Sequence, residues 1–126
     1  MEKDLSASVC REVLSLACAR ISRRLRIQKK WTQEDLAVRS GICQSYISNI
    51  EQGKHLISLE KLCTLTEAFE IDLQVCFGYL AKEIDILMKL REYYLNNYEI
   101  FINYRDFGEL IRRNINKENL DLDLYL

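Results

Sequence analysis

The chain contains no proline, and its four glycines lie far apart in 126 residues. Proline breaks helices and glycine weakens or ends them, so long stretches remain in which a helix can continue without interruption. These absences predict an all-α fold. The length predicts one domain, or one small domain with an appendage.

The sequence also lacks the residue combinations from which most enzymatic and metal sites are built. It has one histidine, His55, and five cysteines, an odd number with no C-x-x-C pair. This spacing argues against a disulfide framework and against a structural zinc site. No paired-carboxylate or glycine-rich phosphate motif is present either. We therefore expect no enzymatic activity, no metal and no cofactor, and we interpret His55 as a loop residue.

Four of the cysteines are predicted to be buried, reduced thiols, because each stands where a small apolar residue would suit a helix face. These are Cys10, Cys18, Cys63 and Cys76.

Long apolar runs are absent as well. No run approaches the roughly 18 to 20 residues that span a bilayer, and the first residues lack the basic-then-apolar order of a signal peptide. A cytoplasmic protein without a membrane segment is expected.

The residues that are present predict helices for most of the chain. Apolar positions recur at helical spacing from about residue 8 to 30, from 33 to 40, from 44 to the glycine at 53, and from 59 to 70. A connector over 71–78 is expected next, and then helical stripes up to residue 113 with a break at Asn96 and Asn97. Residues 114–126 alternate leucine with aspartate and predict a tail or a short strand.

Two of these helices are expected to form a compact unit around a turn. Thr32 and Asp35 have the spacing of a capping box at the start of the first, and Gly41 can adopt the positive φ that ends it. The second begins near Gln44. Their shared core is predicted to contain Leu36, Ala37, Ile42, Ile47 and Ile50.

The core of the next helix is predicted from its own apolar face. This face consists of Leu59, Leu62, Cys63, Leu65, Thr66 and Phe69.

Basic charge is concentrated in and before this unit, although the net charge of the chain is only −1. Residues 11–56 contain nine Lys and Arg against four acidic residues, a net +5, whereas residues 57–77 carry −3 and residues 78–126 carry −2. Solvated surface charge alone can give such a cluster. Its coincidence with the two-helix unit favours a surface that faces phosphates.

At these residues the chain resembles the phage-repressor and Cro-like helix-turn-helix family, also called the XRE family, over about residues 13–75. The resemblance implies a repressor-like bundle of four to five helices that binds double-stranded DNA, followed here by a C-terminal helical extension. The matching pattern comprises Thr32-Gln33-Glu34, Leu36-Ala37, Gly41, the run from Ser45 to Glu51, Gly53, Leu59 and Leu62.

Base recognition is expected at the exposed front of the second helix, which would enter the major groove. By resemblance, Gln44 would be the main base reader, with Ser45 and Asn49 beside it. Ser48 also lies on this front, and all four side chains can donate and accept hydrogen bonds.

Phosphate contacts are expected around this front. The resemblance implies that Gln33 bridges a phosphate and braces the Gln44 amide. It also implies that Gln52, Lys54 and Tyr46 contact the sugar-phosphate backbone of the DNA. His55 would then lie near phosphate.

Two further residues of the motif each have two interpretations. Arg26 would pair with Glu51, either mainly to orient the helices or also to donate to a phosphate. Cys43 would be a small apolar contact or helix cap, or a redox switch with a lowered thiol pKa.

We divide the chain into a leading segment at 1–12, a DNA-binding domain at 13–77, and a C-terminal segment with an acidic tail at 78–126. One helix-turn-helix reads too few base pairs to find its site alone, so residues 79–113 are predicted to form a homodimer, to pack on the first helix, or both. The expected function is a transcriptional regulator, most often a repressor, on a palindromic operator. The alternative is an antitoxin or similar regulator whose C-terminal half binds a protein partner.

Overall fold

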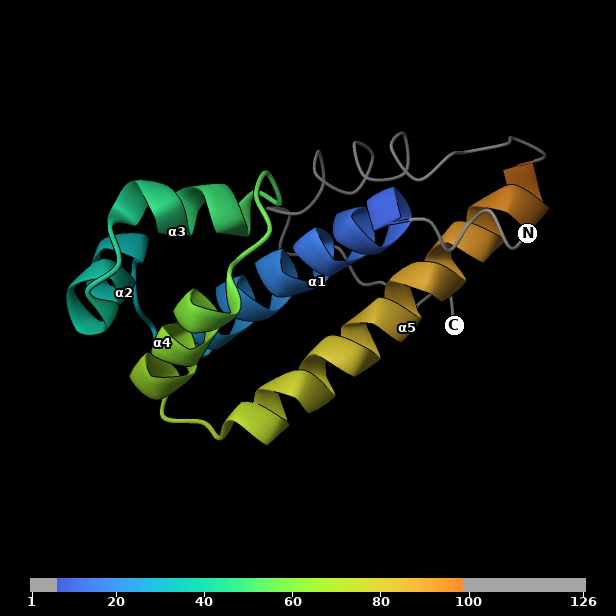
Figure 1. Cartoon of the computed structure of the whole chain (residues 1–126). Helices are drawn as coiled ribbons and strands as arrows, with labels where there is room; N and C mark the ends of the chain where they lie inside the picture. The colour runs from blue at the N-terminus through green and yellow to red at the C-terminus, as the bar shows by residue number, and fades with distance from the viewer. Residues whose placement is uncertain (1–6, 99–126) are drawn as a thin grey trace.

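The computed structural model describes the backbone of residues 7–98 and the side chains of residues 11–90. Within this part the chain is all-helical, as the sequence predicts, and it forms a helix-turn-helix bundle (Figure 1). The helices are α1 (Ala7–Gln28), α2 (Gln33–Ser40), α3 (Gln44–Glu51), α4 (Leu59–Phe69) and α5 (Leu73–Tyr98).

Helix α1 is the centre of the bundle. It lies antiparallel beside α5 and also contacts α3, while α4 packs on α2 and on α5 (Figure 1). The long α1 therefore packs against a C-terminal segment of the same chain. Its buried apolar residues join the main hydrophobic core and include Val13, Leu16, Ala17, Cys18 and Ile21.

Helix α5 begins earlier than the sequence suggests, and the connector predicted over 71–78 is wrong. Only residues 70–72 separate α4 from α5, and Gly78 lies inside α5. Cys76 and Leu80 are both buried, one helical turn apart. Burial of this stripe outweighs the cost of about 1 kcal/mol for a glycine within a helix.

The break predicted at Asn96 and Asn97 is also wrong, because α5 continues through both residues to Tyr98. Asparagine is only a weak helix breaker, and tertiary context commonly overrides such a propensity. The helical stripe predicted up to residue 113 and the alternating segment 114–126 lie outside the described residues.

The apolar stripe of α5 packs within the chain, which is one of the two predicted roles of this segment. Leu80, Ile86, Leu87 and Leu90 are buried in the main core, and Ile84 packs against it in a partly buried position. The side chains of Tyr93, Tyr94 and Tyr98, farther along α5, lie outside the described part.

The predicted core face of α4 needs two corrections. Leu59 is 71% exposed, and Cys63 is exposed as well. Leu59 occupies the first helical position, where the chain enters α4 from an exposed loop. The stripe that is buried consists of Leu62, Leu65, Thr66 and Phe69.

Burial of the cysteines was therefore predicted correctly at two positions and wrongly at one. Cys18 and Cys76 are buried, whereas Cys63 is exposed, and the side chain of Cys10 lies outside the described part. Desolvation raises the pKa of the Cys18 thiol to about 12. Within residues 7–98 no helix has the length and apolar content required to cross a membrane.

Candidate DNA-binding surface

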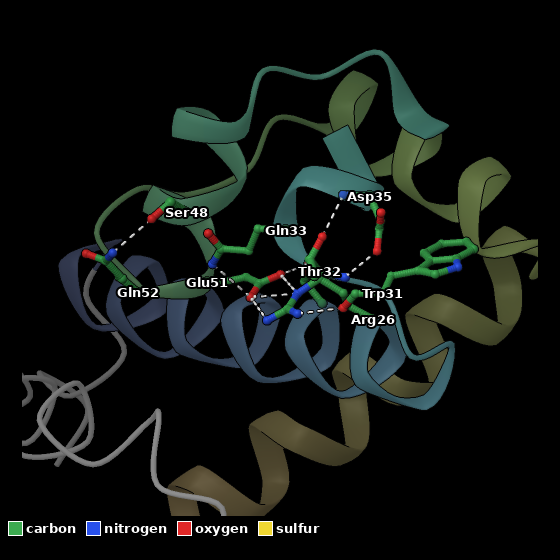
Figure 2. Close-up of polar contacts among 9 residues, drawn as sticks. Arg26, Trp31, Thr32, Gln33, Asp35, Ser48, Glu51 and Gln52 are labelled. Atoms are coloured by element: carbon green, nitrogen blue, oxygen red, sulfur yellow. Dashed lines mark hydrogen bonds and ion pairs between the residues drawn. The ribbon is translucent and has the colours of Figure 1, made fainter. Parts of the chain in front are cut away.

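Helix α2 is fixed at its start by the predicted capping box. The Thr32 hydroxyl accepts a hydrogen bond from the Asp35 backbone N–H at 3.0 Å, and the Asp35 carboxylate accepts from the Thr32 N–H at 2.8 Å (Figure 2). The Thr32 backbone and hydroxyl together lower the pKa of the Asp35 carboxyl. Two N–H groups that would otherwise lack a helical partner are thereby satisfied.

The turn after α2 depends on a glycine, as predicted. Gly41 has φ = 74°, and its N–H donates to the Ala37 carbonyl at 2.9 Å. Ser40 accepts from the Ile42 N–H at 3.1 Å, which places the buried Ile42 under the turn. This turn sets the angle at which α3 leaves α2.

Helix α3 has a buried back and a polar front. Ile47 and Ile50 are each 1% exposed, so its apolar side is fully covered. Gln44 and Ser45 are exposed, and Ser48 and Asn49 are partly exposed. All four predicted base readers are therefore at least partly exposed to a ligand. One of them, Ser48, already accepts a hydrogen bond from the Gln52 amide at 2.9 Å (Figure 2).

A buried ion pair holds α3 against α1. The Arg26 guanidinium donates from Nε and Nη2 to the Glu51 carboxylate at 2.9 Å each, and from Nη1 to the Trp31 carbonyl at 2.8 Å (Figure 2). Glu51 is 1% exposed, and Arg26 is 9% exposed. The predicted Arg26–Glu51 pair is confirmed, and it links α1 to α3.

The hydroxyl of Ser22 completes this buried network, and sequence reasoning missed it. Ser22 is 5% exposed and donates to Glu51 at 3.5 Å. The available signal was its position one helical turn before Arg26, on the same face of α1.

Gln33 is positioned by the same carboxylate. Its amide Nε2 lies 3.3 Å from Glu51 Oε1 and donates to it (Figure 2). The predicted contact between Gln33 and the Gln44 amide is not among the hydrogen bonds of the described residues, so this bracing stays a prediction for the DNA complex. Because Gln33 is the first residue of α2, its amide lies at the positive end of that helix.

The remaining predicted phosphate contacts surround the end of α3. The Tyr46 hydroxyl accepts from the Ser58 N–H at 3.4 Å, which connects α3 to the start of α4 and leaves the phenolic hydrogen free to donate. Gly53, with φ = 70°, turns the chain after α3, and the side chains of Lys54 and His55 that follow are exposed.

Cys43 stands at the N-cap of α3 and is exposed. Its sulfur lies 3.4 Å from the Ser45 hydroxyl. The Ser45 side chain and the Tyr46 backbone N–H lower the pKa of this thiol. Cys43 was predicted to be a small apolar contact or helix cap, or a redox switch; it stands at the N-cap without a side-chain cap hydrogen bond, and the apolar contact and the switch stay predictions.

A second buried carboxylate lies between α1 and α5 and was not predicted. Glu83 is 1% exposed and accepts from Arg20 Nε at 2.8 Å and from Arg24 Nη2. Its partners precede it by 63 and 59 residues, so no local pattern reveals the contact. The cluster ties α5 to α1.

The arrangement of α2, a glycine turn and α3 with an apolar back and a polar front defines a helix-turn-helix unit of the DNA-binding class. Residues 23–76 match the family model described as Helix-turn-helix. This match covers somewhat less than half of the chain and supports its predicted resemblance to the XRE, phage-repressor and Cro-like helix-turn-helix family of DNA-binding regulators. Neither the curated proteins nor the solved structures gave a match.

Proposed function

We propose that the protein is a transcriptional regulator that binds a specific double-stranded DNA sequence, most often as a repressor. The observation that carries this proposal is the front of α3, where Gln44, Ser45, Ser48 and Asn49 face outward from a fully covered back. A helix fixed in this way can enter the major groove without rearrangement of the bundle. Its DNA ligand also favours a cytoplasmic location.

Gln44 is the main base reader in this proposal. It is the first residue of α3 and is exposed, so its amide can reach a base edge and form two hydrogen bonds with adenine. Ser45 and Asn49 read neighbouring positions, and Ser48 contributes less because the Gln52 amide already donates to it.

The phosphate contacts of the proposal flank α3 on both sides. Gln33 donates from the start of α2, and Gln52, Lys54 and the Tyr46 hydroxyl donate from beyond the recognition face. Arg26 contributes mainly by orienting α3, because three of its five N–H groups already have partners and it is 9% exposed.

The protein is proposed to act as a homodimer on a palindromic operator, with residues 78–126 as the dimerisation segment. Exposed apolar side chains on two faces of α5, Phe77 on one and Val75 and Tyr79 on the other, support a protein contact through this helix. Two copies would read half-sites about one DNA turn, roughly 34 Å, apart.

The DNA proposal is tested by selecting bound sequences from a random DNA pool and then measuring affinities for the selected site. Gln44→Ala should lose about 1 to 3 kcal/mol of binding free energy and relax specificity at one base pair. Gln74→Ala is the matched control, because Gln74 is an exposed glutamine on α5. A pool that yields no preferred sequence would contradict sequence-specific binding.

The phosphate role is tested by the salt dependence of binding. Lys54→Ala should weaken binding to all sequences alike and lower the slope of log K against log salt by about one. An unchanged slope would remove Lys54 from the phosphate contacts.

The second candidate function is an antitoxin or similar regulator, in which the C-terminal half binds a different protein and DNA binding serves autoregulation. The same exposed residues of α5 support it, because apolar side chains on a surface commonly mark protein contacts. Sedimentation of the purified protein separates the two candidates. A stable homodimer favours the first, and a monomer that forms a stoichiometric complex with a small protein encoded beside it favours the second.

A further inference from the structure

A groove of about 170 Å³ lies between α1 and α5, outside the DNA-binding surface. Its lining residues are Ile21, Arg24, Leu25 and Gln28 from α1 and Tyr79 from α5. Ile21 is buried and Leu25 half-buried, so the floor is apolar, whereas Arg24, Gln28 and Tyr79 are exposed at the sides. The volume suits one or two aliphatic side chains rather than a large cofactor.

The apolar surface continues from the groove along both helices. Val75, one helical turn before Tyr79, is 41% exposed, and Ile27, one turn after Arg24, is 49% exposed. These side chains leave aliphatic area in water at the end of the bundle where α1 finishes and α5 begins.

Positive charge lies at one side of the groove, where Arg24 lines it. Glu83 accepts from both Arg20 and Arg24, so one carboxylate faces two guanidinium groups and the cluster has a net charge of +1. The Arg24 side chain is 48% exposed, and Lys82, one turn after Tyr79, is exposed on α5. An occupant that is apolar and acidic would complement this surface.

One segment of the chain has this composition. Residues 120–126 read L-D-L-D-L-Y-L, and residues 114–126 contain three acidic residues and one lysine. In an extended segment, side chains alternate between two faces. Leu120, Leu122 and Leu124 would then share one face, and Asp121 and Asp123 the other.

The length of the chain permits this contact within one molecule. From Tyr79 to Tyr98, α5 covers 19 residues, or about 29 Å at 1.5 Å per residue. Residues 99–119 span about 31 Å as a helix and about 70 Å when extended. Either conformation is long enough for residue 120 to return to the groove.

We infer that the groove between α1 and α5 binds the leucine–aspartate segment 120–126 of the same chain. One or two of the leucines occupy the apolar floor formed by Ile21 and Leu25, and the aspartates lie at the mouth beside Arg24 and Lys82. The contact covers part of the exposed apolar surface of α5 and does not depend on DNA binding.

The test is photo-crosslinking of the full-length protein with Tyr79→benzoylphenylalanine, followed by mass spectrometry of the digested product. Tyr79 is 41% exposed, so a larger aromatic side chain can be accommodated. A crosslink to residues 118–126 in a product of monomer mass is expected. Ala81→benzoylphenylalanine is the control, because Ala81 is exposed but lies about 200° around α5 from Tyr79.

Charge complementarity is tested by combining the probe with Asp121→Asn and Asp123→Asn. Loss of both carboxylates should lower the crosslinked fraction about three-fold. These changes leave the helices of the bundle unaltered in sequence. A fraction equal to that of the unaltered tail would show that the aspartates do not face Arg24 and Lys82.

Three outcomes would overturn the inference. A crosslink of dimer mass would make the occupant a second copy, a crosslink to another segment would reassign the groove, and a yield no higher than the Ala81 control would leave the groove empty. An amide NMR spectrum provides an independent check without the probe. In it, Asp121→Lys with Asp123→Lys should shift the signals of Gln28 and Tyr79, and unchanged signals would contradict the contact.

Discussion

Replacement of Glu51 by glutamine removes one negative charge from the centre of the bundle and keeps the shape of the side chain. Glu51 is 1% exposed and accepts hydrogen bonds from Arg26, Ser22 and Gln33. The glutamine amide would place a donor against these donors and leave the buried Arg26 guanidinium without a counter-charge. Both changes act on the contact that holds α3 against α1.

The expected cost follows from this burial. Removing one partner of a buried ion pair destabilises proteins by about 3 to 5 kcal/mol, out of a total stability of about 5 to 15 kcal/mol. For a domain of this size the midpoint of thermal unfolding should fall by more than about 10 °C. DNA affinity should also fall at temperatures where the variant is folded, because Gln33, Arg26 and Ser22 then compete for a single amide oxygen and Gln33 is held less firmly.

Urea unfolding followed by circular dichroism and by the fluorescence of the single tryptophan, Trp31, measures this cost. Asp85→Asn is the matched control, since Asp85 forms a 2.9 Å pair with Lys89 whose side chains are both more than half exposed. It should cost less than about 0.5 kcal/mol.

A double-mutant cycle separates the pair from its surroundings. Arg26→Met combined with Glu51→Leu should cost less than the sum of the two single changes, because no charge is left buried alone. If Glu51→Gln costs no more than the Asp85 control, or if the cycle shows no coupling, the buried pair does not orient α3 as described.

Three further predictions test other parts of the structure. Gly78→Ala should stabilise the protein by about 0.5 to 1 kcal/mol, because Gly78 is helical and a Cβ there meets open space. Gly41→Ala should instead destabilise it by about 1 kcal/mol, because φ at Gly41 is 74°. A lower free energy of unfolding for Gly78→Ala in chemical denaturation would contradict the placement of Gly78 inside α5. Cys43 should react with iodoacetamide faster than Cys18 near pH 8, because its lowered pKa gives more thiolate and because Cys18 is buried, and the modified protein should lose DNA binding. Mass spectrometry measures the two reaction rates, and a binding assay measures the loss of affinity. Equal reaction rates would refute the lowered thiol pKa of Cys43. Glu83→Gln should lower the free energy of unfolding by about 1 to 3 kcal/mol and speed amide hydrogen exchange in α5. The loss should be smaller than for Glu51→Gln, because the Arg24 side chain is about half exposed. Unchanged exchange rates would show that the Arg20–Arg24–Glu83 cluster does not hold α5 against α1.

The helix-turn-helix was predictable because its signals are local. Thr32 and Asp35 stand three residues apart, and Gly41 occupies the only position that needs a left-handed conformation between α2 and α3. Such features depend on neighbours in the chain, so the sequence alone places both helices within a residue or two.

The start of α5 and the exposure of Leu59 could not be predicted in the same way. The helix continues through Gly78 because Cys76 and Leu80 are buried, a result of tertiary packing. Leu59 has the spacing of a core residue, yet it lies where the core ends. The burial of Glu83 depends on Arg20 and Arg24, about 60 residues earlier.

Helix α1 holds both buried carboxylates, Glu51 of α3 through Arg26 and Glu83 of α5 through Arg20 and Arg24. All three arginines lie within two turns of one helix, so ion pairs tie both the recognition helix and α5 directly to α1. In a dimer formed through α5, the distance between the two recognition helices would be set by this frame. Such a dimer would accept one spacing between half-sites, and an operator lengthened by a few base pairs would lose one of its two contacts instead of being bridged by a stretched linker.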